Sequence, residues 1–182
     1  MCLRKNLFWT PTTYRGAFEQ APSPMWTDVW VNWDPQNTIY PSATDTISGE
    51  IVTNLIWTSN KVYLVQGPVY LKSLLTIQPG TIVMFDKNTP GSALIVTKQG
   101  TLVAEGTVTQ PIVFTSNAIA GQRNIGDWGG LVILGEAVNN LPANAASGTP
   151  AGIGNIEGLP TTSNTEYGGN NDQDSSGYFK VR

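Results

Sequence analysis

The middle of the chain carries a short repeat of apolar segments separated by glycine turns. Residues 75–83 (LTIQPGTIV) and 94–103 (LIVTKQGTLV) each hold an apolar strand, a turn with glycine and a second apolar strand. Their glycine-threonine pairs begin at Gly80 and Gly100, so the spacing is 100 − 80 = 20 residues. A period of about 20 residues built from strands and turns indicates a β-solenoid, in which each coil stacks on the next. We therefore expect an all-β chain.

The composition of the chain argues against several classes of binding partner and of catalytic chemistry. The 182 residues, enough for one domain with or without an appendage, are 40% hydrophobic but only 13% charged, against a usual share of about 25%. A net charge of −3 argues against nucleic-acid binding, which usually needs a basic stripe. Histidine is absent, and with it the commonest general base and metal ligand. Cys2 is the single cysteine, so no internal disulfide can form, and no apolar run of about 20 residues predicts a transmembrane segment.

Residues 1–45 differ in composition from the rest and are predicted to form an irregular aromatic arm or cap. They contain four of the six tryptophans and five prolines, so a long helix is excluded. Two interpretations stay open: the segment caps one end of the core, or it docks on a neighbouring subunit or a sugar. The rings predicted to form that interface are Phe8, Trp9, Tyr14, Phe18, Trp26, Trp30 and Trp33.

Residues 46–137 have the pattern expected of β-helix coils. Short apolar or alternating segments predict strands at 51–52, 55–57, 62–65, 69–71, 74–77, 82–85, 93–96, 102–104 and 112–114, with another within 128–135. Turn residues such as Gly67-Pro68 and Pro79-Gly80 separate them. Residues 138–166, rich in Asn, Ala, Gly, Pro and Thr, predict a surface-loop excursion. Residues 167–182 predict an acidic turn and the start of a further strand, which belongs to an incomplete chain or is completed by another molecule.

The order of these motifs resembles a family of exported bacterial surface proteins and lipoproteins, most of them uncharacterised. The motifs are ISGEI at 47–51, WT at 57–58, KVYL at 61–64, LTIQPGT at 75–81, PIVFTS at 111–116, GDWGGLVILG at 126–135, IEG at 156–158 and YGG at 167–169. The resemblance covers residues 47–182 and implies a right-handed parallel β-helix with an extracellular or cell-surface place. It implies no known activity.

The chain departs from that family in two ways. Family members are usually longer, with coils that continue beyond the last residues of this chain. Residues 12–18 and the Trp26 to Trp33 cluster resemble the segment that closes the family at its carboxyl end, yet here they come first. Either this arm closes the open end of a neighbouring copy, or the sequence is cut from a longer or tandem chain.

An acidic loop near the carboxyl end is the best candidate ligand site. In NNDQDSSG at 170–177, oxygen-bearing side chains alternate at Asp172, Asp174 and Ser176, and a glycine follows. This spacing is typical of the first half of a calcium loop, and Asn170 with backbone carbonyls would supply further oxygens. The alternative is a solvated acidic turn without metal.

Candidates for catalysis are sparse. Asp86, Glu105, Asp127 and Glu136 fall along the predicted coils, but no second carboxylate stands at a spacing that assigns an acid/base pair. Asp127, beside a tryptophan and two glycines, is predicted to be a turn or cap residue. Trp128 could stack on a sugar ring, or belong to an apolar core.

These observations favour a non-enzymatic, extracellular structural protein. The open edges of a β-helix invite pairing with another chain, and a contact that does not close on itself gives a filament. The expected partner is therefore a second copy of the chain, assembling end to end. The alternative is a carbohydrate-binding surface module, with calcium assisting the contact, whereas a polysaccharide-degrading enzyme would need a carboxylate cluster that the sequence does not reveal.

Overall fold

The computed structural model describes residues 15, 23, 25, 27, 28, 31–144 and 148–180. The predictions for Phe8, Trp9, Tyr14, Phe18, Trp26 and Trp30 lie outside the described residues. The chain divides into two units, Met1–Trp33 and Asp34–Arg182. In the first unit, the described Trp33 is 63% exposed.

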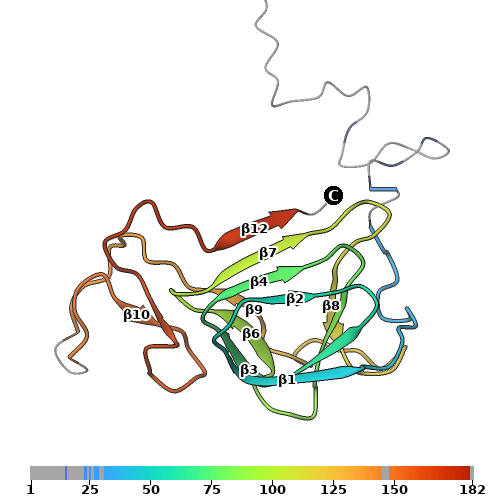
Figure 1. Ribbon diagram of the computed structural model, residues 1–182, viewed down its shortest axis with the longest axis horizontal. Helices are drawn as coiled ribbons and strands as arrows, with labels where there is room; N and C mark the ends of the chain where they lie inside the picture. Colours follow the sequence, from blue (N-terminus) through green and yellow to red (C-terminus); the bar gives the residue numbers. More distant parts are fainter. Residues whose placement is uncertain are drawn as a thin grey trace, which may run out of the picture. The chain divides into compact units, whose positions relative to one another are not determined.

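The second unit is a parallel β-helix, which confirms the predicted fold class (Figure 1). Its strands are β1 (Asp45–Ile51), β2 (Leu55–Trp57), β3 (Val62–Leu71), β4 (Leu74–Ile77), β5 (Ile82–Phe85), β6 (Ala93–Val96), β7 (Thr101–Glu105), β8 (Val113–Ser116), β9 (Gly130–Ile133), β10 (Gly154–Asn155), β11 (Glu166–Tyr167) and β12 (Gly177–Lys180). The strands predicted at 55–57, 74–77, 82–85 and 93–96 match β2, β4, β5 and β6 in both bounds. The strand predicted to start near Tyr178 is β12.

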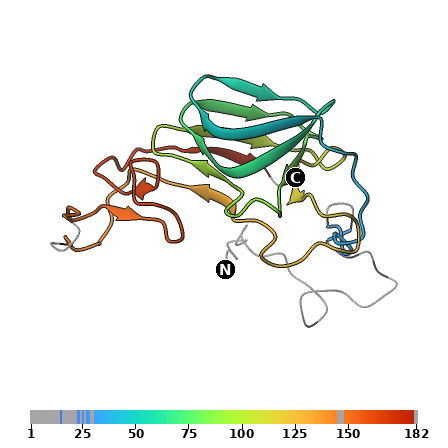
Figure 2. The same ribbon diagram turned by 90° about the horizontal axis from the view of Figure 1, so that it is seen from below.

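Two parallel sheets form the walls of the coils. The four-stranded sheet has the order β12-β7-β4-β2, and the larger sheet has the order β8-β5-β3-β6-β9, with β1 also paired to β3. Figure 2 shows strands of successive coils lying over one another. Only β10 and β11, outside the coils, pair antiparallel among the named strands.

Side chains of the same column stack inside the coils and make the core. Leu55 pairs with Leu75 and Leu75 with Leu102, while Trp57 pairs with Ile77 and Ile77 with Ala104. Because side chains alternate across a strand, these positions all point inward, and Leu75, Ile77, Leu102 and Ala104 in the middle coils are at most 4% exposed. The apolar columns explain why the sequence alternates in short segments.

A 20-residue step does separate paired strands of successive coils, but Gly80 and Gly100 do not occupy equivalent positions in those coils. Gly80 lies in the turn before β5, where its amide donates to the carbonyl of Gln110, whereas Gly100 lies in the turn before β7, at a different corner. The strands that pair at a 20-residue step are β2 with β4, the first half of β3 with β5, and the end of β1 with the second half of β3. The two glycines also serve different needs: Gly80 has φ +81, and a Cβ on Gly100 would collide with the carbonyl of Leu71.

The dipeptide Gly67-Pro68 was predicted to separate two strands. In the structure it instead bends a single strand. Strand β3 runs through it: residues before Gly67 pair with β5, and residues from Pro68 onward pair with β6. Gly67 takes φ +71, and its amide donates to Oγ of Ser92. Because β5 pairs with the first half of β3 and β6 with the second half, the bend turns one continuous strand around a corner of the coil.

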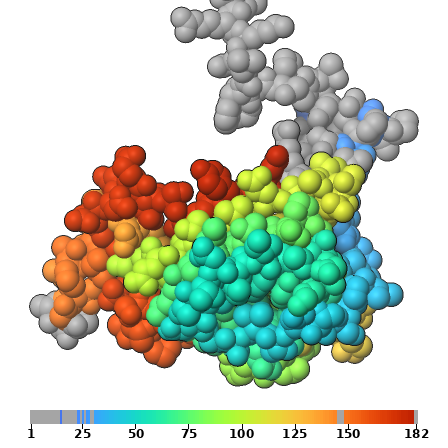
Figure 3. All heavy atoms as spheres, in the orientation of Figure 1, coloured from blue at the N-terminus to red at the C-terminus, as the bar shows by residue number. Residues whose placement is uncertain are grey.

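Residues 134–176, which we call the lobe, leave the coils between β9 and β12 and contain β10 and β11. The lobe lies beside the coils in Figure 3, in orange and red. Its apolar residues Ile156, Leu159 and Tyr167 pack against the outer surface of β6, where Ile95 is fully buried although it faces away from the coil interior. The predicted excursion is therefore packed on the sheet rather than free in solvent.

The guanidinium of Arg123 binds the segment that precedes β1. The guanidinium of Arg123 donates to the carbonyls of Pro35, Gln36 and Thr38, at 2.9, 3.1 and 2.7 Å. It also lies 4.8 Å from the ring centre of Tyr40, within the range of a cation–π contact. This clasp fixes residues 35–40 on the connection between β8 and β9.

Candidate functional site at the two edges of the coils

The outermost strands of the four-stranded sheet form the candidate site. Among the described residues, β2 pairs only with β4, and β12 pairs only with β7. We call the outer side of β2 the head edge and the outer side of β12 the tail edge; Figure 1 shows them on opposite sides of the sheet. An unpaired edge carries backbone donors and acceptors that can pair with another chain.

The hydrogen bonds of β2 show which of its residues serves the head edge. The carbonyl of Trp57 accepts from the amide of Gln78, so the polar groups of Trp57 point toward β4. Backbone direction alternates along a strand, and the N–H and C=O of Ile56 therefore point away from β4. Ile56 is 62% exposed, so its side chain is also available on the outer surface.

The tail edge is built in the same way. The amide of Leu102 donates to the carbonyl of Ser176, and the amide of Gly106 donates to the carbonyl of Lys180. By the same alternation, Gly177 and Phe179 direct their N–H and C=O groups away from β7. The head edge thus offers the backbone groups of Ile56, and the tail edge offers those of Gly177 at the start of β12 and of Phe179 within it.

Exposure rises sharply in the inner columns where they reach the edges. Leu55 is 37% exposed, whereas Leu75 and Leu102, in the same column, are fully buried. At the other edge Phe179 is 42% exposed, against 4% for Ala104 next to it. These side chains have the chemistry of core residues and lack the covering coil that buries their equivalents.

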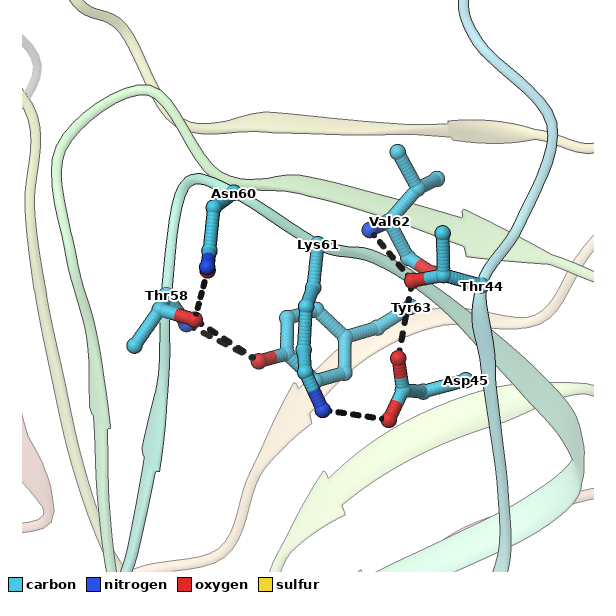
Figure 4. A network of polar contacts seen from close by, with 7 residues as sticks. All are labelled: Thr44, Asp45, Thr58, Asn60, Lys61, Val62 and Tyr63. Atoms are coloured by element: carbon cyan, nitrogen blue, oxygen red, sulfur yellow. Dashed lines mark hydrogen bonds and ion pairs between the residues drawn. The ribbon is translucent and has the colours of Figure 1, made fainter.

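A polar network holds the strand ends beside the head edge (Figure 4). The Lys61 ammonium lies 2.8 Å from Oδ1 of Asp45, and this contact, with the hydroxyl of Thr44, lowers the pKa of the Asp45 carboxyl. Thr44 accepts the amide hydrogen of Val62, and Tyr63 accepts that of Thr58 while its ring stacks on Trp57 at 4.7 Å. The network sets where β1 begins on β3.

The predicted calcium residues are tied to the backbone of the lobe's first residues. Oδ1 of Asp172 accepts the amide of Val138, and Oδ2 of Asp174 accepts the amide of Glu136, at 3.1 and 3.0 Å. Ser176 Oγ lies 3.5 Å from Oδ2 of Asp174. Within the described residues, no group of three or more Asp, Glu or Cys side chains could hold a metal ion.

Calcium binding by this loop, with oxygens of Asn170, Asp172, Asp174 and Ser176, stays a prediction. Calcium chloride titrated into chelator-treated protein should give saturable heat, and Asp174→Asn should weaken the affinity about tenfold or more, because one of two carboxylates is lost. Asparagine keeps an oxygen for the Glu136 amide, and Glu157→Gln, at an exposed lobe carboxylate, is the matched control. An Asp174→Asn titration identical to wild type would contradict the site.

The carboxylates along the coils hold turns together. Asp127 accepts from the hydroxyl of Ser116 at 2.6 Å and from the amide of Asn124 at 3.1 Å, and these bonds lower its pKa. This confirms the prediction that Asp127 is a turn residue. Asp86, 6% exposed, accepts from the side chains of Gln66, Thr89 and Asn117, and the hydroxyl of Thr89 contributes most to lowering its pKa to about 2. A carboxylate with so low a pKa is a poor proton donor.

Trp128 packs into the core with one face of its ring. It stacks on Phe85 with ring centres 4.0 Å apart. It also lines a pocket of about 240 Å³ together with Phe114 and Arg123. A Trp128→Ala variant would therefore disturb the core as well as any sugar contact, which makes it an ambiguous test of glycan binding.

Sequence reasoning missed the features that define the two edges. Ile56 and Phe179 stand in ordinary apolar segments, and no residue type marks the backbone direction that exposes them. A weak signal existed for the polar column at Asp86, since Gln66 precedes it by 86 − 66 = 20 residues.

Comparisons with known proteins address the fold. A family model described as a pectate-lyase-like β-helix domain matches residues 49–182, most of the chain. Neither the curated proteins nor the solved structures that were compared gave a match. In the described part of the chain, no helix has the length and apolar character needed to cross a membrane.

Proposed function

This chain belongs to the pectate-lyase-like β-helix domain family, and from that premise we propose that it is a structural protein whose copies stack head to tail into a filament. The main support is that stacking would continue the columns of inward-facing side chains from one copy to the next. Stacking the head edge of one copy on the tail edge of another places Leu55 over Gly177 and Trp57 over Phe179, the next members of their own columns.

Head-to-tail stacking also continues an inner column of the larger sheet. Ile51, Leu71, Val96 and Ile133 form one inner column, in which Leu71 and Val96 are fully buried and Ile133 is 44% exposed. A second copy in the same register brings its Ile51 over Ile133. Because the contact joins two different surfaces and leaves each copy with one free edge, it propagates instead of closing.

The proposed place of this filament is the cell surface or the extracellular space. Support comes from the resemblance of residues 47–182 to exported surface proteins and lipoproteins, which is narrower than the β-helix family itself. The low charged fraction of 13% suits contacts made by apolar columns and backbone pairing. A non-enzymatic role is supported by Asp86 and Asp127, whose oxygens are engaged in turn hydrogen bonds.

Two proline variants test the assembly. Ile56→Pro and Phe179→Pro each remove one N–H from an open edge without removing a hydrogen bond inside the chain, and proline is tolerated at such edge positions. Each variant alone should raise the protein concentration needed for assembly about tenfold or more, because a backbone bond and strand fit are lost. Electron microscopy and sedimentation velocity of the wild type and both variants measure this.

A mixture of the two variants gives the sharper result. Ile56→Pro keeps an intact tail edge, and Phe179→Pro keeps an intact head edge. An equimolar mixture should therefore form dimers, and these dimers should not grow into polymers. Val138→Lys, at a 60% exposed position in the lobe, should assemble like the wild type. A wild type that stays monomeric at high concentration, or a mixture that forms filaments, would contradict head-to-tail stacking.

A further inference from the structure

The lobe carries an open cavity of about 770 Å³ that the proposed assembly does not use. Its walls come from residues 141–144, the residues around β10, and Tyr167 on β11. Neither the head edge nor the tail edge contributes to it. We infer that this cavity binds a short neutral saccharide, with the ring of Tyr167 as its apolar platform.

The platform is held in place by a glycine. Tyr167 pairs with Gly154 across the β10–β11 ladder, and a Cβ on Gly154 would collide with the phenol ring of Tyr167 and come within 2.8 Å of Leu141. The ring and Leu141 therefore rest directly on the backbone at Gly154. Tyr167 also packs against the cluster around Ile95 and Leu134, so its position is fixed from the coil side as well. Such fixation reduces the ordering cost of binding.

The described lining of the cavity carries no formal charge. The described lining residues include no Asp, Glu, Lys or Arg; they are apolar groups such as Leu141 and Ile153 together with amides and hydroxyls. Oδ1 of Asn155 lies 3.2 Å from the hydroxyl of Thr165, a fully buried residue, and the same hydroxyl lies close to the carbonyls of Pro160 and Thr162. Amide and hydroxyl groups donate to and accept from sugar hydroxyls equally well.

These features select the ligand class. A pyranose ring has an apolar C–H face that suits an aromatic ring and a rim of hydroxyls that suits side-chain amides. An acidic sugar or a charged peptide would lose hydration in this cavity without gaining a counter-charge. The volume falls within the range of about 300–1,000 Å³ typical of small-molecule sites.

The test uses defined tetrasaccharides on the full chain. Cello-, manno-, xylo- and malto-tetraose are compared with tetragalacturonate by saturation-transfer NMR, and ligands that bind are titrated by calorimetry. We expect at least one neutral tetrasaccharide to bind and tetragalacturonate not to bind. Tyr167→Ala should lower the affinity about tenfold or more, while Tyr167→Phe, which keeps the ring, should stay within about threefold.

Two more variants separate binding from folding. Thr161→Arg, at an exposed lining position, should block the cavity with an unchanged melting temperature. Tyr178→Ala, at a 66% exposed tyrosine outside the lobe, should leave binding unchanged. The inference is overturned if no neutral tetrasaccharide binds, if only tetragalacturonate binds, or if Thr161→Arg binds as tightly as wild type. None of these results bears on filament formation, which is scored separately.

Discussion

Replacing Phe85 with alanine should lower the free energy of unfolding by about 3–5 kcal/mol, the usual cost of truncating a buried phenylalanine. Phe85 is fully buried in β5, inside the column that joins Val65 to Ser116, and its ring stacks on Trp128. The variant loses the transfer free energy of the ring, leaves a cavity, and removes the aromatic pair. Since small domains are stable by only about 5–15 kcal/mol, the loss is a large share of the total.

Denaturant unfolding at concentrations where the chain is monomeric measures this change. Phe179→Ala is the matched control, because Phe179 also points into the coil but is 42% exposed. Its loss should be about 1 kcal/mol, in line with the smaller area removed from solvent. Equal losses at Phe85 and Phe179 would mean that the middle coils do not form the core.

The second large effect belongs to Asp86 and should depend on pH. Its oxygens accept from Thr89, Gln66, Asn117 and the amide of Asn88, and these bonds link three successive coils. The pKa falls from 3.8 to about 2 in the folded chain, with the Thr89 hydroxyl as the first cause. That difference corresponds to about 2 kcal/mol of stability in favour of the ionised, folded state.

The direction of the pH dependence follows from the lowered pKa. Above the unfolded value of 3.8 the contribution is fully present, and it is lost as the pH falls from there through about 2. Thermal melts between pH 5 and pH 2 should therefore show a decline that Asp86→Asn reduces. Asp86→Ala should be less stable than Asp86→Asn at pH 7, because it leaves buried donors without an acceptor. An unchanged pH profile in Asp86→Asn would contradict this assignment.

Local patterns predicted most of the strands correctly. A strand such as Ile82–Phe85 is apolar, short and flanked by turn residues, and all three properties are visible within a few positions. The same holds for Asp127, whose neighbouring glycines indicated a turn. Local patterns failed where the answer lay in another coil: Gly67-Pro68 resembles a chain-reversing turn, but β5 and β6 on either side of the bend keep β3 continuous.

The predicted calcium residues and Trp128 show what the sequence could not predict about the candidate sites. The spacing of Asp172 and Asp174 indicated alternating oxygens, yet it could not show that each accepts an amide hydrogen from residues 34 and 38 positions earlier. Trp128 could be read as a sugar platform or a core ring, and only its contact with Phe85 assigns one face to the core. The cavity beside Tyr167 had no sequence signal, because Gly154 is one glycine among 19.

The sequence by itself determined the local structure and composition of this protein: short alternating strands, turns at short intervals, few charges and no histidine. These properties arise from neighbouring residues, so they can be read along the chain. The tertiary structure decided which strands pair, because corners differ greatly in length: Leu55 and Leu75 are 20 residues apart, but Leu102 and Gly177 are 75 apart. Pairing over such variable distances depends on which columns bury one another, and that same packing leaves Ile56 and Phe179 on the two open edges.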